Sequence, residues 1–395
     1  MCVESQTTPP ADLRSRDGKP LRILFVASRD SQHPVAAGGE RLLQLLAEEL
    51  AARGHAVSFW SAGHASLPRR ETHRGVRVER IGRTRFFAPF VWVRFVLLPR
   101  GHFDVVIEEG MGGERVPFLA VFLFRGPTVG ALFQDHRPLI RTMYGGSSLV
   151  VRTGLMLQKV LLWAYQDGPL LTCSKATRDW LVSEGVPGAR VGVIYPRVRL
   201  PPGVLARPWS ERENAIVSIG NFRPTKRFEE AIEVVGRLRQ EVPSATLHLV
   251  GRPYHQEYLS HLERRAAAAE LQGAVRFHLS ATEEEKYSLL ARAKALVVHS
   301  PVEGFGWTIP EAGLVGTPTV ANPGVPKDAL DPGVSGEVVP FGDVAEYVRV
   351  LSRWMCSEEA WRPFSEGARH SAQRFTAPVL RPGMEAWLNE QLRRR

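Results

Sequence analysis

The chain has 395 residues and carries a formal net charge of +10 at pH 7. Its 44% hydrophobic and 23% charged residues exclude a disordered or fibrous protein. Its length favours two domains, because one domain usually holds roughly 100–200 residues. The three cysteines, Cys2, Cys173 and Cys356, are too widely spaced for a disulfide framework or a cysteine metal site, which favours a reducing compartment.

The basic charge fits a phosphorylated ligand, a membrane surface or nucleic acid, because arginine binds phosphate well. The basic residues are scattered and form no known nucleic-acid-binding motif, so we expect no nucleic acid partner. No apolar stretch reaches the roughly 18 residues of a membrane span. Residues 1–20 lack the apolar core of a secretory signal and are expected to be a disordered lead-in. We therefore expect a cytoplasmic protein.

The first half of the chain alternates short apolar runs with amphipathic segments. Continuous apolar runs are typical of strands buried on both faces of a parallel sheet. Such runs occur at residues 21–28, 56–60, 103–109, 127–134, 170–174 and 191–196. Leucines at helical spacing predict a helix over 40–54, and Ser174 is suited to cap a helix over 175–185. The proline-rich segment 196–214 predicts a linker.

The second half repeats this alternation after the linker. Further apolar runs predict strands at residues 215–220, 245–251, 275–280, 295–300 and 317–322. Helices are predicted between them. Strands that alternate with helices in this way indicate an α/β fold with two Rossmann-like, doubly wound parallel sheets facing a cleft. We expect domains over 21–200 and 201–375.

The segment HSPVEGFGWTIPEAGLVGTPTVAN, residues 299–322, contains Glu303 and Glu311, eight positions apart. The preceding strand would bring the chain to the carboxyl edge of a parallel sheet, where ligands bind in such folds. Pro310 fits only a first helical turn, which places a helix start near Trp307. Glycines and helix amides suit an anion, and carboxylates suit hydroxyl groups. The alternative is two ordinary glutamates, one favoured by the helix dipole.

A second motif, SIGNFRPTKRFEE at residues 218–230, gathers Arg223, Lys226 and Arg227 at the start of a helix. Cations at this position oppose the helix dipole, which favours a bound phosphate. The alternative of solvated surface charge stays open.

Two weaker candidates lie in the first half. AAGGERLL places Gly38 and Gly39 before a helix, where they form either an anion cradle or a simple entry loop. FQDHRPL places Asp135 and His136 after a strand, and His136 would contact a substrate unless it has a structural role.

The sequence lacks the motifs that are typical of several other enzyme classes. No DxD pair, zinc-ligand spacing, GxGxxG fingerprint or GxxxxGK[ST] phosphate loop occurs. Their absence argues against metal-clamped sugar transfer, a zinc enzyme, a dinucleotide dehydrogenase and a P-loop enzyme. We expect no metal and no cofactor.

Taken in order, the glycine pair, TCSKATRDWLVSEGVP, SIGNFRPTKR and the paired-glutamate segment resemble the family-4 retaining glycosyltransferases of the GT-B fold. The resemblance covers roughly residues 21–390. It implies transfer of a sugar from a nucleotide-diphosphate sugar to a hydroxyl of a small-molecule, natural-product or glycan acceptor, with retention and without a metal. It also implies that a tail helix, about 376–395, packs back on the first domain.

The resemblance assigns roles to individual residues. Glu303 would hold hydroxyls of the donor sugar and Glu311 the ribose. Arg223 and Lys226 would bind the diphosphate, and His136 would lie at the acceptor side. The remaining donor-binding positions are Gly39, Gly251, Arg252, Gly304, Phe305, Gly306, Thr308 and Ile309.

Two positions depart from the family pattern. Asn221 replaces the usual arginine, so Arg223 would make a shifted phosphate contact. YPRV, residues 195–198, replaces the family's PNG motif.

Three alternatives remain open. They are a sugar-nucleotide epimerase or pseudoglycosyl coupling enzyme, a non-catalytic sugar-nucleotide binder, and a membrane-surface enzyme with a lipid-linked acceptor. The last would bring the protein to the inner face of the membrane. Residues 83–101 and 148–165 mix cations with aromatic and aliphatic residues in a way that suits an interface, although helices packed on a sheet also explain them.

Overall fold

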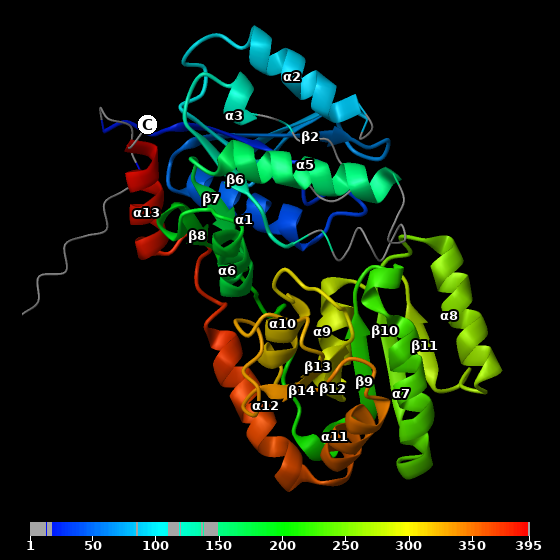
Figure 1. Ribbon diagram of the computed structural model, residues 1–395. Coiled ribbons are helices and arrows are strands. Elements are labelled where there is room, and N and C mark those ends of the chain that lie inside the picture. Colours follow the sequence, from blue (N-terminus) through cyan, green and yellow to red (C-terminus); the bar gives the residue numbers. More distant parts are fainter. Residues whose placement is uncertain are drawn as a thin grey trace, which may run out of the picture.

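The computed structural model describes residues 13, 18–83, 86–109, 118, 120–135, 137 and 149–393. Two α/β domains follow one another along the chain, each built on its own sheet (Figure 1). This arrangement confirms the predicted fold class. No helix within these described ranges is both long and apolar enough to cross a membrane.

The first sheet has eight strands in the order β3-β4-β2-β1-β5-β6-β7-β8. The pairs along it are parallel except for β3 with β4. The strands are β1 (Arg22–Val26), β2 (Ala56–Gly63), β3 (Arg70–His73), β4 (Val76–Arg83), β5 (Val105–Glu109), β6 (Thr128–Ala131), β7 (Leu170–Thr172) and β8 (Val191–Val193). The helices are α1 (Gly38–Ala52), α2 (Phe87–Leu97), α3 (Ala120–Leu123), α5 (Leu149–Tyr165) and α6 (Lys175–Ser183).

The second sheet is parallel throughout, in the order β11-β10-β9-β12-β13-β14. Its strands are β9 (Glu213–Ile219), β10 (Thr246–Val250), β11 (Val275–His278), β12 (Ala293–Val298), β13 (Thr319–Ala321) and β14 (Gly336–Val338). Its helices are α7 (Phe228–Glu241), α8 (Gln256–Ala268), α9 (Glu283–Arg292), α10 (Thr308–Leu314), α11 (Val344–Cys356) and α12 (Glu358–Gln373).

Local sequence explains where several helices begin. The Ser174 hydroxyl accepts a hydrogen bond from the backbone N–H of Thr177 at 3.1 Å, so the predicted cap of α6 is present. Thr282 and Glu285 form a reciprocal capping box at α9. Such caps satisfy backbone donors that a helix start leaves without partners.

The sequence analysis missed three strands, β3, β4 and β14. In β4 charged side chains occupy alternate positions, Arg77 and Glu79 among them, because this strand lies near the edge of the sheet, next to β3. An edge position allows polar side chains that a central parallel strand excludes. A search for continuous apolar runs therefore passes over it.

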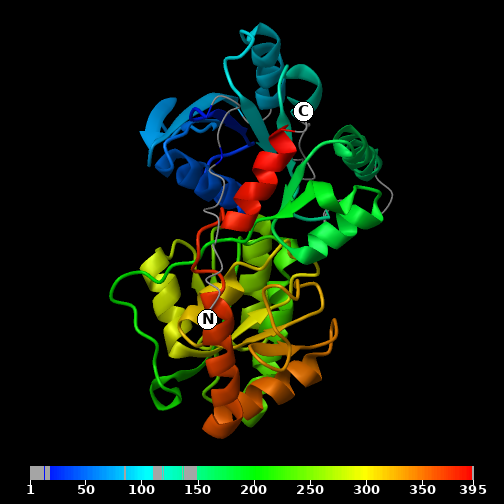
Figure 2. The same ribbon diagram turned by 90° about the vertical axis from the view of Figure 1, so that its left-hand side faces the viewer.

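The end of the chain returns to the first domain. There α13 (Pro382–Arg393) packs against β8, on the first domain (Figure 2). The indole N–H of Trp387 donates to the Ala189 carbonyl at 2.9 Å. Glu385 pairs with Arg53 of the first domain. The helix begins at Pro382, six residues later than the predicted start at about 376.

Buried histidines make the free energy of unfolding depend on pH. Burial, with a smaller effect of Arg227, lowers the pKa of His299 to about 3. Burial, with help from the neighbouring His278, lowers the pKa of His248 to about 4. The unfolded chain binds more protons at these positions than the folded chain below about pH 6.5. Stability is therefore lost as the pH falls from 6.5 towards 4.

We predict that His299→Leu makes this pH dependence shallower. One such histidine lowers the unfolding free energy by about 2 kcal/mol between pH 7 and pH 5. His299 lies against Tyr347, and its ring nitrogens have no hydrogen-bond partner among the described residues. Denaturant titrations at both pH values measure the difference, with the exposed His261 changed to Leu as the matched control. An equal fall in His299→Leu and wild type would contradict the assignment.

Candidate active site

A cleft of about 720 Å³ lies between the two domains, and residues of both domains line it. In each parallel sheet the chain leaves the strands at their carboxyl ends, where doubly wound folds bind ligands. Several residues that follow β1, β6, β9 and β12 line this cleft. The strand order therefore brings the predicted motifs of the second domain opposite the glycine pair of the first.

Glu303 and Lys226 contact each other at the wall of the cleft. The Lys226 Nζ lies 2.5 Å from Glu303 Oε1, and the two side chains are 17% and 16% exposed. Burial alone would raise the pKa of the Glu303 carboxyl. The Lys226 ammonium outweighs burial, with a smaller contribution from Arg223, so this pKa lies below its usual value. Glu303 is therefore an anion at neutral pH.

Arg223 lies beside this pair and also lines the cleft. It precedes a short 3₁₀ turn, Pro224–Lys226, that brings Lys226 back towards Glu303. The Nε of Arg223 is buried and has no hydrogen-bond partner within the described ranges. A guanidinium with an unused donor is available to an anionic oxygen after a small rotation.

The loop that carries Glu303 is held by close backbone contacts. The Glu303 N–H donates to the Gly324 carbonyl at 2.9 Å. A Cβ on Gly304 would lie 2.4 Å from the Phe133 carbonyl of the first domain, so no larger residue fits there without moving a domain. Gly306 adopts the left-handed φ of +91° that favours glycine, and the chain then enters α10.

Glu311 lies in α10 at another part of the cleft, where it is 3% exposed. Its Oε1 is 2.9 Å from Lys286 Nζ of α9 and 3.6 Å from Arg41 Nη1 of α1. Both cations also contact Glu283, at 2.9 and 3.6 Å. The guanidinium of Arg41 also lies over the ring of Trp307. Arg41 thus joins the first domain to the carboxylate that sequence analysis assigns to a ribose.

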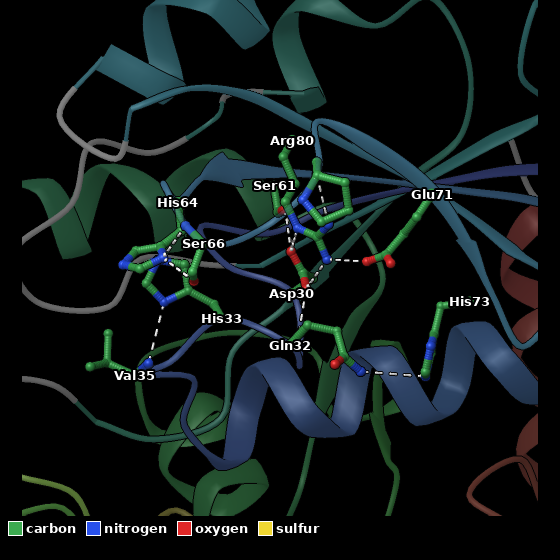
Figure 3. A network of polar contacts seen from close by, with 11 residues as sticks. Asp30, Gln32, His33, Val35, Ser61, His64, Ser66, Glu71, His73 and Arg80 are labelled. Carbon is green, nitrogen blue, oxygen red and sulfur yellow. Dashed lines mark hydrogen bonds and ion pairs between the residues drawn. The ribbon is translucent and has the colours of Figure 1, made fainter.

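A buried ion pair holds the loop that leads from β1 to α1 (Figure 3). Arg80 of β4 donates to both carboxylate oxygens of Asp30, at 2.8 and 2.9 Å, and Ser61 donates to the same carboxylate at 2.7 Å. Burial raises the pKa of Asp30, but Arg80 and Ser61 lower it more. The loop ends at Gly38 and Gly39. They are the first two residues of α1 rather than residues before it, and both line the cleft.

Three predicted donor-binding residues have contacts that sequence alone did not indicate. The Phe305 side chain is 2% exposed and packs against the rings of Tyr195 and Phe375, although the residue also lines the cleft. The Ile309 N–H donates to the Gly306 carbonyl at 3.0 Å, so it is already used within the turn. Arg252 donates to the Pro34 carbonyl across the cleft.

The other predicted positions are placed as follows. Gly251 and Thr308 line the cleft, and a Cβ on Gly251 would clash with the Gly220 carbonyl. His136 lies outside the described residues. Asp135, its neighbour, pairs with Arg137 on the first domain and does not line the cleft.

The sequence did not single out Arg41, Lys286 or Glu283 as residues of the site, although the segment 280–286, which contains the last two, was expected to affect donor selectivity. Arg41 lies two positions after the glycine pair, which is the only sequence signal that could have drawn attention to it. Lys286 and Glu283 lie in EEEK at the start of α9. Acidic residues are typical of a helix start, so this pattern does not indicate a binding site. No group of three or more His, Cys, Asp or Glu suited to a metal occurs in the part of the chain described.

Known proteins match both domains. Residues 206–371 match the family described as Glycosyl transferases group 1, and residues 36–200 match Glycosyltransferase Family 4. Together the two matches span most of the chain, which is a glycosyltransferase. A D-inositol 3-phosphate glycosyltransferase of Streptomyces bingchenggensis is 29% identical over 70% of this chain. That match spans 64% of the relative's own length.

Solved structures agree on the fold of this glycosyltransferase. A sucrose-phosphate synthase from Thermosynechococcus elongatus superposes with a TM-score of 0.72 and 18% identity, over 94% of this chain and 98% of that one. Anabaena HepE in complex with UDP and glucose gives a TM-score of 0.72 and 18% identity, over 95% and 100%. These neighbours have the GT-B fold.

We predict that Gly304→Ala separates the two domains of the glycosyltransferase. The added Cβ would meet a backbone carbonyl of the opposite domain, which cannot rotate away. The radius of gyration from small-angle X-ray scattering should increase, and transfer activity should fall roughly a hundredfold because reacting groups become misplaced.

Gly273→Ala is the matched control, since a Cβ there meets nothing within 4 Å. The control should leave both measurements unchanged. An unchanged radius of gyration together with full activity in Gly304→Ala would contradict the close approach.

Proposed function

We propose that this enzyme transfers a sugar from a nucleotide-diphosphate sugar to a hydroxyl of a small-molecule, natural-product or glycan acceptor, with retention at the anomeric carbon. One observation carries the proposal. Glu303 and Lys226 contact each other in a cleft where a second buried carboxylate, Glu311, is also paired with cations. A ligand with hydroxyls at both ends and a diphosphate between them complements such an arrangement.

In this proposal each end of the donor meets a carboxylate. Glu303 accepts hydrogen bonds from the sugar hydroxyls, and Glu311 accepts them from the ribose, because an ionised carboxylate offers only acceptors. Arg223 and Lys226 face the diphosphate between them. Gly251, Gly304 and Thr308 line the cleft with backbone atoms that a ligand can approach closely.

The cations have a chemical task in the transfer. The bond between the anomeric carbon and the diphosphate oxygen breaks, and the acceptor oxygen forms the new bond as its hydroxyl proton is released. Negative charge grows on the departing diphosphate while the sugar becomes oxocarbenium-like. Arg223 and Lys226 would stabilise that charge electrostatically, which is the largest contribution in many enzymes. We propose that no metal takes part.

Two comparisons support a nucleotide-diphosphate sugar as the donor. HepE, which shares the fold, has been solved in complex with UDP and glucose, and the relatives of this chain include glycosyltransferases and glycogen synthases. The acceptor would bind on the side of the first domain, where His136 stays a proposed contact. Cytoplasmic location likewise remains a proposal.

A second candidate function is transfer to a lipid-linked acceptor at a membrane surface. The observation that favours it is a set of exposed apolar side chains on α2, with Phe90, Val93 and Val96 at least half exposed. If this function is right, a lipid-linked acceptor should be used in vesicles and its water-soluble head group should be a poor substitute.

We predict that one nucleoside diphosphate stabilises the enzyme selectively. Ligand at a hundredfold excess over its Kd adds about 2.7 kcal/mol to the unfolding free energy, which raises the Tm by a few degrees. Glu311→Ala and Lys226→Ala should abolish the shift, because each removes a group that grips the ribose or the diphosphate.

Exposed residues of the same type, changed as Glu263→Ala and Lys327→Ala, are the controls and should keep the shift. A shift that survives in both Glu311→Ala and Lys226→Ala would refute the donor site.

We predict retention and independence from metals. Proton NMR of the product should show the new bond with the anomeric configuration of the donor, and activity should persist in excess EDTA. Inverted product would contradict the retaining assignment. Loss of activity in EDTA that Mg²⁺ or Mn²⁺ restores would contradict the role given to Arg223 and Lys226.

A further inference from the structure

Three helices of the first domain expose large apolar side chains. The exposed fractions reach 75% for Leu97 on α2 and 66% for Met156 on α5. We call this set the apolar flank. It comprises Phe86, Phe90, Val93, Val96 and Leu97 at α2, Phe122 at α3, and Met156 and Trp163 at α5. None of these residues lines the cleft.

The helix α2 is apolar on two faces. Phe87, Val91 and Phe95 are buried and pack on the sheet in one hydrophobic cluster. Phe90, Val93 and Val96 follow each other at helical spacing and are exposed. The buried face explains how the helix is anchored, so the exposed face is not needed for the core. A soluble surface helix normally carries polar residues there.

The apolar flank is continuous across the three helices. α2 packs against α3, and the Phe122 and Trp163 rings of α3 and α5 lie 6.0 Å apart. Figure 1 shows these three helices together on the first domain. A contiguous apolar patch marks an interaction site, whereas single exposed apolar residues do not.

The charged side chains on the helices of the flank are all positive. The sequences of α2, α3 and α5 contain no aspartate or glutamate. Exposed cations accompany the apolar residues, namely Arg100, Arg125, Arg152 and Lys159. Among the residues that the structure describes, none of these four takes part in an ion pair. Arg94 differs, since Glu79 neutralises it at 2.6 Å.

We propose that the apolar flank docks on the surface of an anionic lipid bilayer. Aromatic and aliphatic side chains would enter the boundary between head groups and acyl chains, while the four cations meet the anionic head groups. A symmetric contact with a second copy of this chain would instead bring these cations against one another. The charge pattern therefore favours lipid over self-association.

This docking goes beyond the proposed transfer and does not depend on it. The flank holds none of the residues assigned to the donor. Vesicle binding and nucleotide binding can therefore be measured separately, and either can fail while the other holds.

The test is co-sedimentation of the full chain with vesicles of equal parts phosphatidylglycerol and phosphatidylcholine. The protein should bind these vesicles and leave pure phosphatidylcholine vesicles largely unbound. Added salt should weaken binding, because each basic residue near such a surface is worth about fivefold in partition. Arg152→Gln with Lys159→Gln should lower the partition accordingly.

The apolar contribution is tested by the triple variant Phe90→Ser, Val93→Ser, Val96→Ser. The partition coefficient should fall at least about tenfold, with the Tm unchanged because these side chains are exposed. The matched control changes Leu205, Val334 and Phe341 to Ser, since these residues are exposed elsewhere, in the linker and the second domain. The control should bind vesicles as wild type does.

Two outcomes would overturn the proposal. One is wild-type protein that stays in solution with anionic vesicles at low salt. The other is a concentration-dependent dimer, seen by light scattering, that the triple variant dissociates, because the flank would then be a contact between copies. The Tm of each variant without any ligand serves as a check that the variant is folded, and it should be the same in all of them.

Discussion

The candidate site depends on the ion pair between Glu303 and Lys226. A carboxylate this buried is costly unless a cation compensates it. Lys226 provides that charge at 2.5 Å, and it can do so only because the 3₁₀ turn before α7 brings it to the end of β12. The pair therefore fixes the relative positions of two loops from neighbouring strands of the second sheet. Removing either partner would leave an uncompensated charge in the wall of the cleft.

A second buried carboxylate links the two domains. Glu311 is almost fully buried, and Lys286 and Arg41 both lie close to its charge. Arg41 belongs to the first domain, so the closed cleft and the charge balance at Glu311 are linked. Asp328 adds further contacts, accepting from the Lys175 N–H at 2.7 Å and the Tyr195 hydroxyl at 2.9 Å. Polar contacts therefore link the two domains beside an apolar cluster in which Phe305 packs against Tyr195.

Much of this arrangement was accessible from sequence. Strand, loop and helix signals around Glu303 and Glu311 fixed their places, because a parallel sheet always presents its loops at the carboxyl edge. Arg223 and Lys226 followed from the same rule one strand away. The side-chain contacts of Phe305 and Arg252 could not be predicted, because their partners are distant in the sequence. Phe305 packs against Phe375 near the end of the chain, and Arg252 donates to Pro34 of the opposite domain. Arg41 was not predicted as a residue of the site for the same reason. Its partners are more than 200 positions away along the chain.

The distribution of charge separates the cleft from the rest of the surface. The cleft holds nearly as many carboxylates as cations, and Glu303 and Glu311 each pair with a lysine. A polyanion such as nucleic acid would meet repulsion there, whereas a ligand that combines hydroxyls with a diphosphate finds a partner for each group. The net charge of +10 must therefore reside mainly outside the cleft. Part of it lies among the exposed apolar side chains of α2, α3 and α5, where no carboxylate of these helices offsets it. A cleft with balanced charge favours a specific small ligand, while an unbalanced basic and apolar surface favours an extended anionic one.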